Sequence, residues 1–151
     1  EVIKRSAFDN LNFNLLDVVL TVNHDPHKLL ARTVSKTLVL SVDQRGLKYT
    51  ATLPNTTLGN DTLEMLERGD LRESSFIFGI SANDAEWKTG NQYPVRYVKN
   101  IRSLQDVSIV THAAYESTDV MVAARELNGA LNPDYIHDMQ AMKEVLKKYE
   151  H

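Results

Sequence analysis

Three polar residues with the side-chain chemistry of a hydrolase lie far apart in the sequence: His24, Ser75 and Asp106. A serine hydroxyl becomes an effective nucleophile when a histidine takes its proton, and a third polar group can orient that histidine. Each of the three is predicted near a strand end, where only the fold can bring them together. His112 is an alternative third member, or a core histidine. A serine beside a turn is more often an ordinary hydrogen-bonding residue, so the spacing alone leaves both interpretations open.

The segment His24-Asp25-Pro26-His27 also contains metal-ligand types. Two histidines with an aspartate between them could contribute to a metal site, which makes a metal-dependent hydrolase using His24 and His27 a further hypothesis. The proline breaks regular geometry, however, and His27 is interpreted most simply as a solvent-exposed turn residue. We therefore predict no metal and no organic cofactor.

Composition narrows the classes of function. The chain has 151 residues, of which 42% are hydrophobic and 25% charged, an ordinary balance for one globular domain. The absence of cysteine excludes disulfides, thiolate nucleophiles and cysteine-based zinc sites. A net charge of −3 gives no sign of a nucleic-acid-binding surface, and no apolar run is long enough to cross a membrane. Because the chain starts at Glu1 rather than methionine, we expect a fragment or a processed form.

The hydrophobic pattern predicts the elements that must position these residues. Strands are predicted over residues 17–23, 37–42, 47–53, 74–81, 93–100 and 101–110, and a surface loop over residues 83–91. A helix is predicted to follow Asn55-Thr56-Thr57 and to end at about Arg68, because Gly69 can take the left-handed conformation that closes helices. Pro26 is expected to end the first strand, and Asp106 to begin the last one.

This order of elements predicts the fold class. Strands, one helix, more strands and then helices over 120–127 and 132–149 indicate a mainly β protein with helices (α+β) rather than a βαβ fold. We expect a compact antiparallel β-barrel surrounded by helices. Residues 1–128 are predicted to form this domain, and residues 129–151 an amphipathic helix that packs on it or mediates association.

An ordered series of short motifs points to a known family. The motifs are Asn23-His24-Asp25, Asp43-Gln44-Arg45-Gly46-Leu47, Arg68-Gly69-Asp70-Leu71, Ser75-Phe76-Ile77-Phe78 and Asp106-Val107-Ser108-Ile109-Val110-Thr111. Together with Glu1-Val2-Ile3 and Ala7-Phe8, the series resembles the prohead proteases of tailed phages, capsid-maturation serine proteases distantly similar to the herpesvirus assemblins. The resemblance covers about Glu1 to Arg125 and lies in the order of the motifs rather than in any one of them.

The resemblance implies an assemblin-like barrel with a His–Ser dyad and a third polar partner. His24 matches the histidine of the family's Asn-His-Asp motif, and Ser75 matches the serine of its Ser-Phe-Gly-Phe motif. The adjacent Ser74 is a rival. Asp106 stands where the family usually has glutamate, and His112 stays an alternative because assemblins use a second histidine as the third member.

The sequence departs from the family pattern beside the expected nucleophile, because Ile77 stands where glycine is usual. The activity implied by the resemblance is that of a serine endopeptidase cleaving capsid and scaffold segments during procapsid maturation. Its implied partners are the scaffolding segment of the major capsid protein, the scaffold, and other copies of the chain, through autoprocessing and homo-oligomer formation; no nucleic acid or membrane is implied. The implied location is the host cytoplasm, inside the procapsid of a phage or prophage. The alternative is a non-catalytic β-barrel assembly or scaffold module on the same fold.

Overall fold

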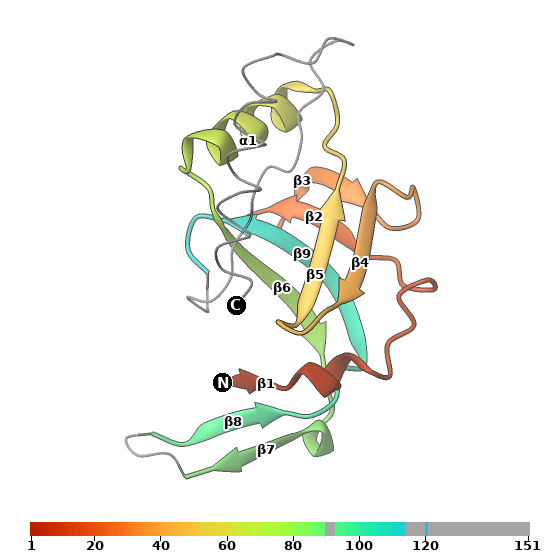
Figure 1. Cartoon of the computed structure of the whole chain (residues 1–151), viewed down its shortest axis with the longest axis vertical. Coiled ribbons are helices and arrows are strands. Elements are labelled where there is room, and N and C mark those ends of the chain that lie inside the picture. Colours follow the sequence, from red (N-terminus) through yellow and green to blue (C-terminus); the bar gives the residue numbers. More distant parts are fainter. Residues whose placement is uncertain (90–92, 114–119, 121–151) are drawn as a thin grey trace. The chain divides into compact units, whose positions relative to one another are not determined.

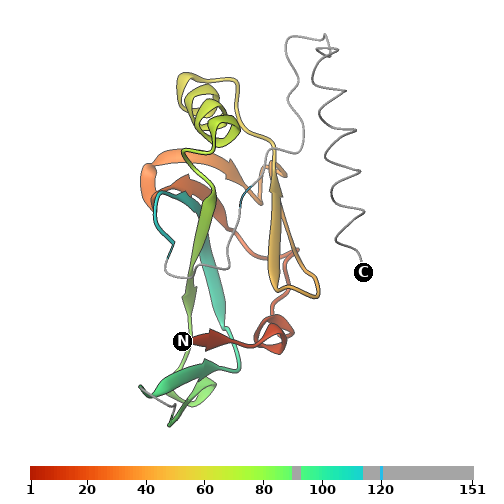
Figure 2. The same ribbon diagram turned by 60° about the vertical axis from the view of Figure 1, so that its left-hand side comes forward.

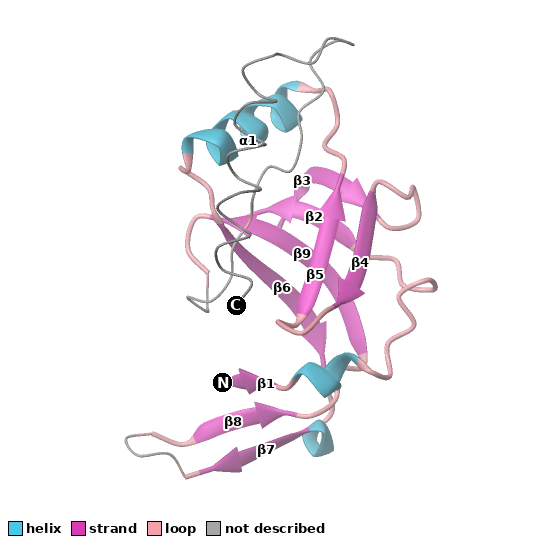
Figure 3. Ribbon diagram, viewed as in Figure 1, coloured by secondary structure: helices cyan, strands magenta, loops and turns pink. Residues whose placement is uncertain are grey.

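The computed structural model describes residues 1–89, 93–113 and 120. Strands dominate this part of the chain, and α1 is its one α-helix (Figures 1 and 3). The elements are β1 (Val2–Ile3), η1 (Arg5–Phe8, 3₁₀), β2 (Val19–Val22), β3 (Asp25–Arg32), β4 (Leu38–Val42), β5 (Leu47–Ala51), α1 (Thr57–Arg68), β6 (Glu73–Gly79), η2 (Ala82–Asp84, 3₁₀), β7 (Ala85–Lys88), β8 (Val95–Val98) and β9 (Ser103–Val110). The predicted mainly β, α+β class is confirmed.

The strands form three sheets. The largest has the order β3-β2-β9-β6, the second has the order β1-β8-β7, and β4 and β5 form a hairpin. Strand β2 runs parallel to β9, and β1 runs parallel to β8, whereas the other neighbours are antiparallel. The two larger sheets are therefore mixed, not purely antiparallel as predicted, and no closed barrel is found among the described residues.

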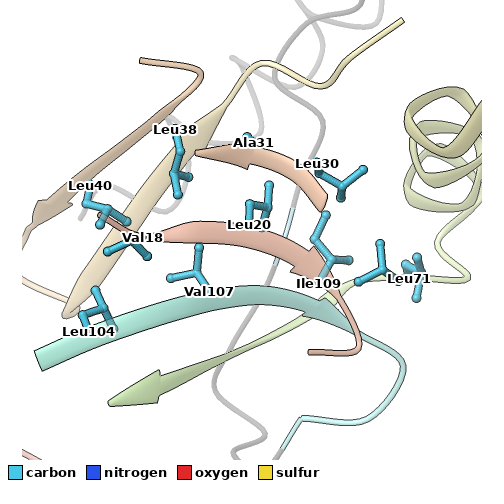
Figure 4. Close-up of a cluster of buried hydrophobic side chains, with 11 residues drawn as sticks. Val18, Leu20, Leu30, Ala31, Leu38, Leu40, Leu71, Leu104, Val107 and Ile109 are labelled. Carbon is cyan, nitrogen blue, oxygen red and sulfur yellow. The ribbon is translucent and has the colours of Figure 1, made fainter. Parts of the chain in front are cut away.

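The main hydrophobic core lies on one face of the four-stranded sheet. Leu20 pairs with Val107 in the register of β2 and β9, so their side chains share this face. Figure 4 shows them packed with Ile109 and with Leu38 and Leu40 of strand β4, all of which are buried. Figure 2, turned by 60°, shows the β4–β5 hairpin beside the sheet. Alternation along β2, and along β9 from Asp106 onwards, places the intervening residues on the opposite face.

A bulge in β9 changes which residues face the core. Ile77 pairs with Asp106, but the next residue of β6, Phe78, pairs with Leu104, so Gln105 is an extra residue. Because of this extra residue, Leu104 packs in the core while Asp106 lies on the opposite face. The prediction that Asp106 begins its strand is therefore wrong: β9 begins at Ser103, and Asp106 lies in its interior.

The elements specified by local signals are confirmed. The β4–β5 hairpin pairs Leu38 with Ala51 and closes with Val42 opposite Leu47. Helix α1 begins after Thr56, whose hydroxyl accepts a hydrogen bond from the Gly59 amide. Gly69 ends the helix with a φ of 77°, in the left-handed region that glycine tolerates.

Two predictions of irregular structure are wrong. The first strand does end before Pro26, because β2 stops at Val22, but the proline is not what ends it: Pro26 lies inside β3, which follows β2 after only two residues. A proline is accommodated there because β3 is an edge strand and its pairing with β2 is irregular. The predicted loop over residues 83–91 contains most of η2 and all of β7, which pairs with β8. The C-terminal helices and the boundary at residue 128 fall outside the described residues, so they stay predictions.

Candidate active site

His24 lies in a two-residue turn between β2 and β3. Val22 pairs with Asp25 across this turn, and the two central residues, Asn23 and His24, have φ values of 53° and 56°. Two consecutive positive φ values are the requirement of a type I′ turn. Among non-glycine residues, asparagine and histidine are enriched in this region, so the sequence can form the turn without glycine. The turn folds His24 back over the end of the sheet.

Strand β9 and Thr111, which follows it, anchor the turn through three hydrogen bonds. The His24 amide donates to Ser108 Oγ over 2.8 Å, and the Asn23 amide donates to the carbonyl of Ile109 over 2.9 Å. The Asn23 side chain accepts a hydrogen bond from the Thr111 amide, just past the end of β9, over 3.0 Å. The backbone position of His24 is therefore determined by a strand distant in the sequence.

The imidazole of His24 contacts the carboxylate of Asp106. Nδ1 of His24 lies 2.6 Å from Oδ1 of Asp106, and the side chains are 29% and 11% exposed. An ionised carboxylate only accepts hydrogen bonds, so Nδ1 carries the proton and Nε2 of a neutral ring is free to take one. The alternative partner, His112, is exposed and makes no such contact with His24. Asp106 is thus the residue that the fold brings to His24.

The register of the sheet separates the two neighbouring serines. Ser75 pairs with Ser108, and Ser108 pairs with Thr21, so these three residues lie in one row on the face that carries Asp106. Ser74 lies on the core face, where its hydroxyl is 3.0 Å from the hydroxyl of Tyr49. Of the two neighbouring serines, Ser75 is therefore the one that shares a face with the His24–Asp106 pair.

Ser75 is partly buried, and its hydroxyl makes no hydrogen bond among the described residues, with His24 or any other group. The fold therefore brings His24 into contact with Asp106 and places Ser75 on the same face without a hydrogen bond to the imidazole. Hydrogen bonds between a nucleophile and its base are often long in the absence of substrate and tighten only when substrate binds.

Two residues of this site escaped the sequence interpretation: Thr21 and Ser108. Thr21 Oγ1 donates to Oδ2 of Asp106 over 2.6 Å and lies 3.1 Å from Ser108 Oγ. Both residues are almost completely buried. A sequence pattern that could have indicated Ser108 is the alternation of polar and apolar residues in its strand: Asp106 and Ser108 are two residues apart in an otherwise apolar segment, so they lie on one face.

The described residues give two further findings. They contain no group of three or more histidine, cysteine, aspartate or glutamate residues arranged to hold a metal ion. None of their helices is long and apolar enough to span a membrane.

A histidine whose Nδ1 is held by a carboxylate, with a serine on the same face of the sheet, is the combination of groups found in serine hydrolases. A family model described as the Caudovirus prohead serine protease matches residues 1–132. The chain therefore belongs to the Caudovirus prohead serine protease family, and the resemblance to prohead proteases is confirmed. No curated protein and no solved structure matches the chain. The likeness to assemblins stays a prediction.

Proposed function

We propose that this protein is a serine endopeptidase that cleaves capsid and scaffold segments during procapsid maturation, with Ser75 as nucleophile, His24 as base and Asp106 as the orienting acid. Membership of the prohead serine protease family supports a phage maturation protease. The observation that carries the assignment of residues is the 2.6 Å contact between His24 Nδ1 and Asp106 Oδ1.

The proposed reaction uses Nε2 of His24 as the base, because Nδ1 is bonded to Asp106. Nε2 takes the hydroxyl proton of Ser75 as Oγ attacks the scissile carbonyl, and the same proton passes to the departing amine. Asp106 keeps the imidazole in the required tautomer and stabilises its cationic form while the proton is held. Water then attacks the acyl-enzyme, His24 takes a proton from that water, and Ser75 regains its hydrogen.

The substrates follow from the family. A prohead protease acts on phage capsid proteins, so we place the reaction in the host cytoplasm and inside the procapsid. The scaffolding segment of the major capsid protein, the scaffold and other copies of the protease are the proposed substrates and partners.

Labelling with a serine-directed fluorophosphonate tests the nucleophile. We expect wild type and Ser74→Ala to be labelled, and Ser75→Ala and His24→Ala to be unlabelled. Ser74→Ala is a matched control because it removes the adjacent hydroxyl, which lies on the core face and bonds to Tyr49.

The same experiment distinguishes a protease from a non-catalytic assembly module. The labelling is repeated on protein co-expressed with the phage's major capsid protein, and cleavage of that capsid protein is followed by mass spectrometry. A wild-type protein that is neither labelled nor able to cleave its capsid protein under these conditions is a non-catalytic module.

A further inference from the structure

We propose that the hydroxyl of Thr21 is a positioning group that holds the Asp106 carboxylate in the orientation in which it meets His24. The role of Thr21 in catalysis rests on the proposed function. The contacts between the side chains of Thr21, Asp106 and His24 do not depend on it. Thr21 would act through Asp106 and would not touch the substrate.

Both oxygens of the Asp106 carboxylate have a donor. Oδ1 accepts a hydrogen bond from Nδ1 of His24, and Oδ2 accepts one from the Thr21 hydroxyl over 2.6 Å. A carboxylate with one bonded oxygen can turn about its last bond, whereas donors on both oxygens fix its plane. The Thr21 bond therefore holds Oδ1 towards the imidazole.

The proton of Thr21 is committed to Asp106. Its oxygen is 2.6 Å from Asp106 Oδ2 and 3.1 Å from Ser108 Oγ, and a hydrogen bond to a charged acceptor is the shorter and stronger kind. Ser108 can instead donate to the backbone carbonyl of Thr21, 3.1 Å away. The two hydroxyls consequently do not compete for one acceptor.

The contacts connect both ends of His24. Ser108 Oγ accepts the His24 amide, while Asp106 contacts the imidazole of the same residue. Thr21 bonds to both of these residues: its hydroxyl donates to Asp106 Oδ2, and its backbone carbonyl accepts a hydrogen bond from Ser108 Oγ. The closed series of contacts holds the backbone and the ring of His24 relative to one another, which is the support that a catalytic geometry requires.

Two substitutions at position 21 separate the effect of the hydroxyl from the effect of side-chain volume. Thr21 is 1% exposed, and valine has nearly the same shape, so Thr21→Val removes the donor with little change in packing. Thr21→Ser keeps the donor and loses a methyl group. A residue needed only for packing would tolerate valine better than serine, whereas a positioning hydroxyl would show the opposite order.

Thr62 provides a matched control. It is 0% exposed, and its hydroxyl donates to the Leu58 carbonyl within α1 over 2.7 Å. Thr62→Val therefore also deletes a buried hydrogen-bonding hydroxyl, in an element that contributes none of the proposed catalytic residues.

The first readout is the kinetics of fluorophosphonate labelling. For Thr21→Val we expect the maximal rate of inactivation to fall about tenfold or more, with the half-saturating probe concentration unchanged, because a partner that orients a functional group is lost. Thr21→Ser should stay within about threefold of wild type, and Thr62→Val should match wild type. If circular dichroism shows that Thr21→Val does not fold, Thr21→Cys, a weaker donor, is expected to give an intermediate loss.

The second readout does not need activity. In protein labelled with ¹⁵N-histidine, the Nδ1–H resonance of His24, assigned by its loss in His24→Gln, reports the contact with Asp106. It should move or broaden in Thr21→Val and not in Thr62→Val. If wild type is labelled by the probe, a maximal rate unchanged in the Thr21 variant overturns the proposal. If wild type is neither labelled nor able to cleave its co-expressed capsid protein, the proposed function fails by itself. Whether or not wild type is labelled, an Nδ1–H resonance that does not move in Thr21→Val overturns the positioning role.

Discussion

The imidazole of His24 and the carboxylate of Asp106 are in contact at 2.6 Å although 82 positions separate the two residues in the chain. The contact depends on two departures from regular sheet geometry. A type I′ turn brings His24 back over the sheet, and a bulge places Asp106 on the face opposite the core. The contact and the turn can each be tested by substitution.

Replacing the carboxylate of Asp106 by an amide should nearly abolish the reaction. We expect Asp106→Asn to lower the rate of fluorophosphonate labelling by about 10³- to 10⁴-fold, because the amide no longer enforces the tautomer with Nδ1 protonated. Asp25→Asn, next to His24 in sequence but paired with Lys28 at the surface, should leave the rate within about twofold. Similar losses in both variants would show that charge near His24, rather than the specific contact, controls labelling.

The backbone of the His24 turn should make Asn23 sensitive to substitution. Asn23→Ala places a side chain that disfavours positive φ at a φ of 53° and removes the acceptor for the Thr111 amide. We expect it to lower the free energy of unfolding by about 1–3 kcal/mol. Asn23→Gly loses the same acceptor without the strain, so it should be less destabilising in urea titrations. Equal stability of the two variants would mean that the turn stores no strain.

Replacing Gly59 by alanine should destabilise the protein, although this substitution usually stabilises a helix. In an exposed helix, glycine to alanine stabilises by about 1 kcal/mol. A Cβ at Gly59 would lie 2.0 Å from the backbone oxygen of Pro54, so we expect Gly59→Ala to destabilise the protein by about 2 kcal/mol or more in chemical denaturation. Glu64→Ala, on an exposed position of α1, is the control and should change stability by less than about 0.5 kcal/mol. A stabilising Gly59→Ala would rule out the close approach of Pro54.

Stability at acid pH should depend on Asp84. Hydrogen bonds from Arg102 first, then from Asn100 and the Ser81 amide, hold the pKa of this carboxyl well below its usual range. A folded-state pKa below the unfolded value gives stability that is present above about pH 4 and is lost as the pH falls towards the folded value.

Asp84→Asn should therefore lower stability at neutral pH and flatten its decline between about pH 5 and pH 2, as measured by urea titrations across that range. Asp17→Asn, which breaks an exposed ion pair with Arg32, should have a smaller effect because solvent screens it. A decline as steep in Asp84→Asn as in wild type would contradict the assignment.

Local patterns were sufficient for several elements of this protein. Alternating apolar residues with Gly46 in the turn specify the β4–β5 hairpin, and capping by Thr56 and Gly69 specifies the ends of α1. These signals lie within a few residues of the structure that they form, so they can be detected in one sequence. The same signals misled at Pro26, since only the position of β3 at the sheet edge makes a proline acceptable there.

The sequence by itself determined the chemistry available to this protein: serine, histidine and aspartate, without cysteine. Only the tertiary structure decided how these groups meet. It pairs His24 with Asp106 and leaves His112 exposed, turns Ser75 to the face of that pair and Ser74 to the core, and adds Thr21 to the carboxylate. The physical reason is that the pairing register of strands distant in the sequence, including one bulge, determines which face every side chain occupies, and a shift of one residue reverses it.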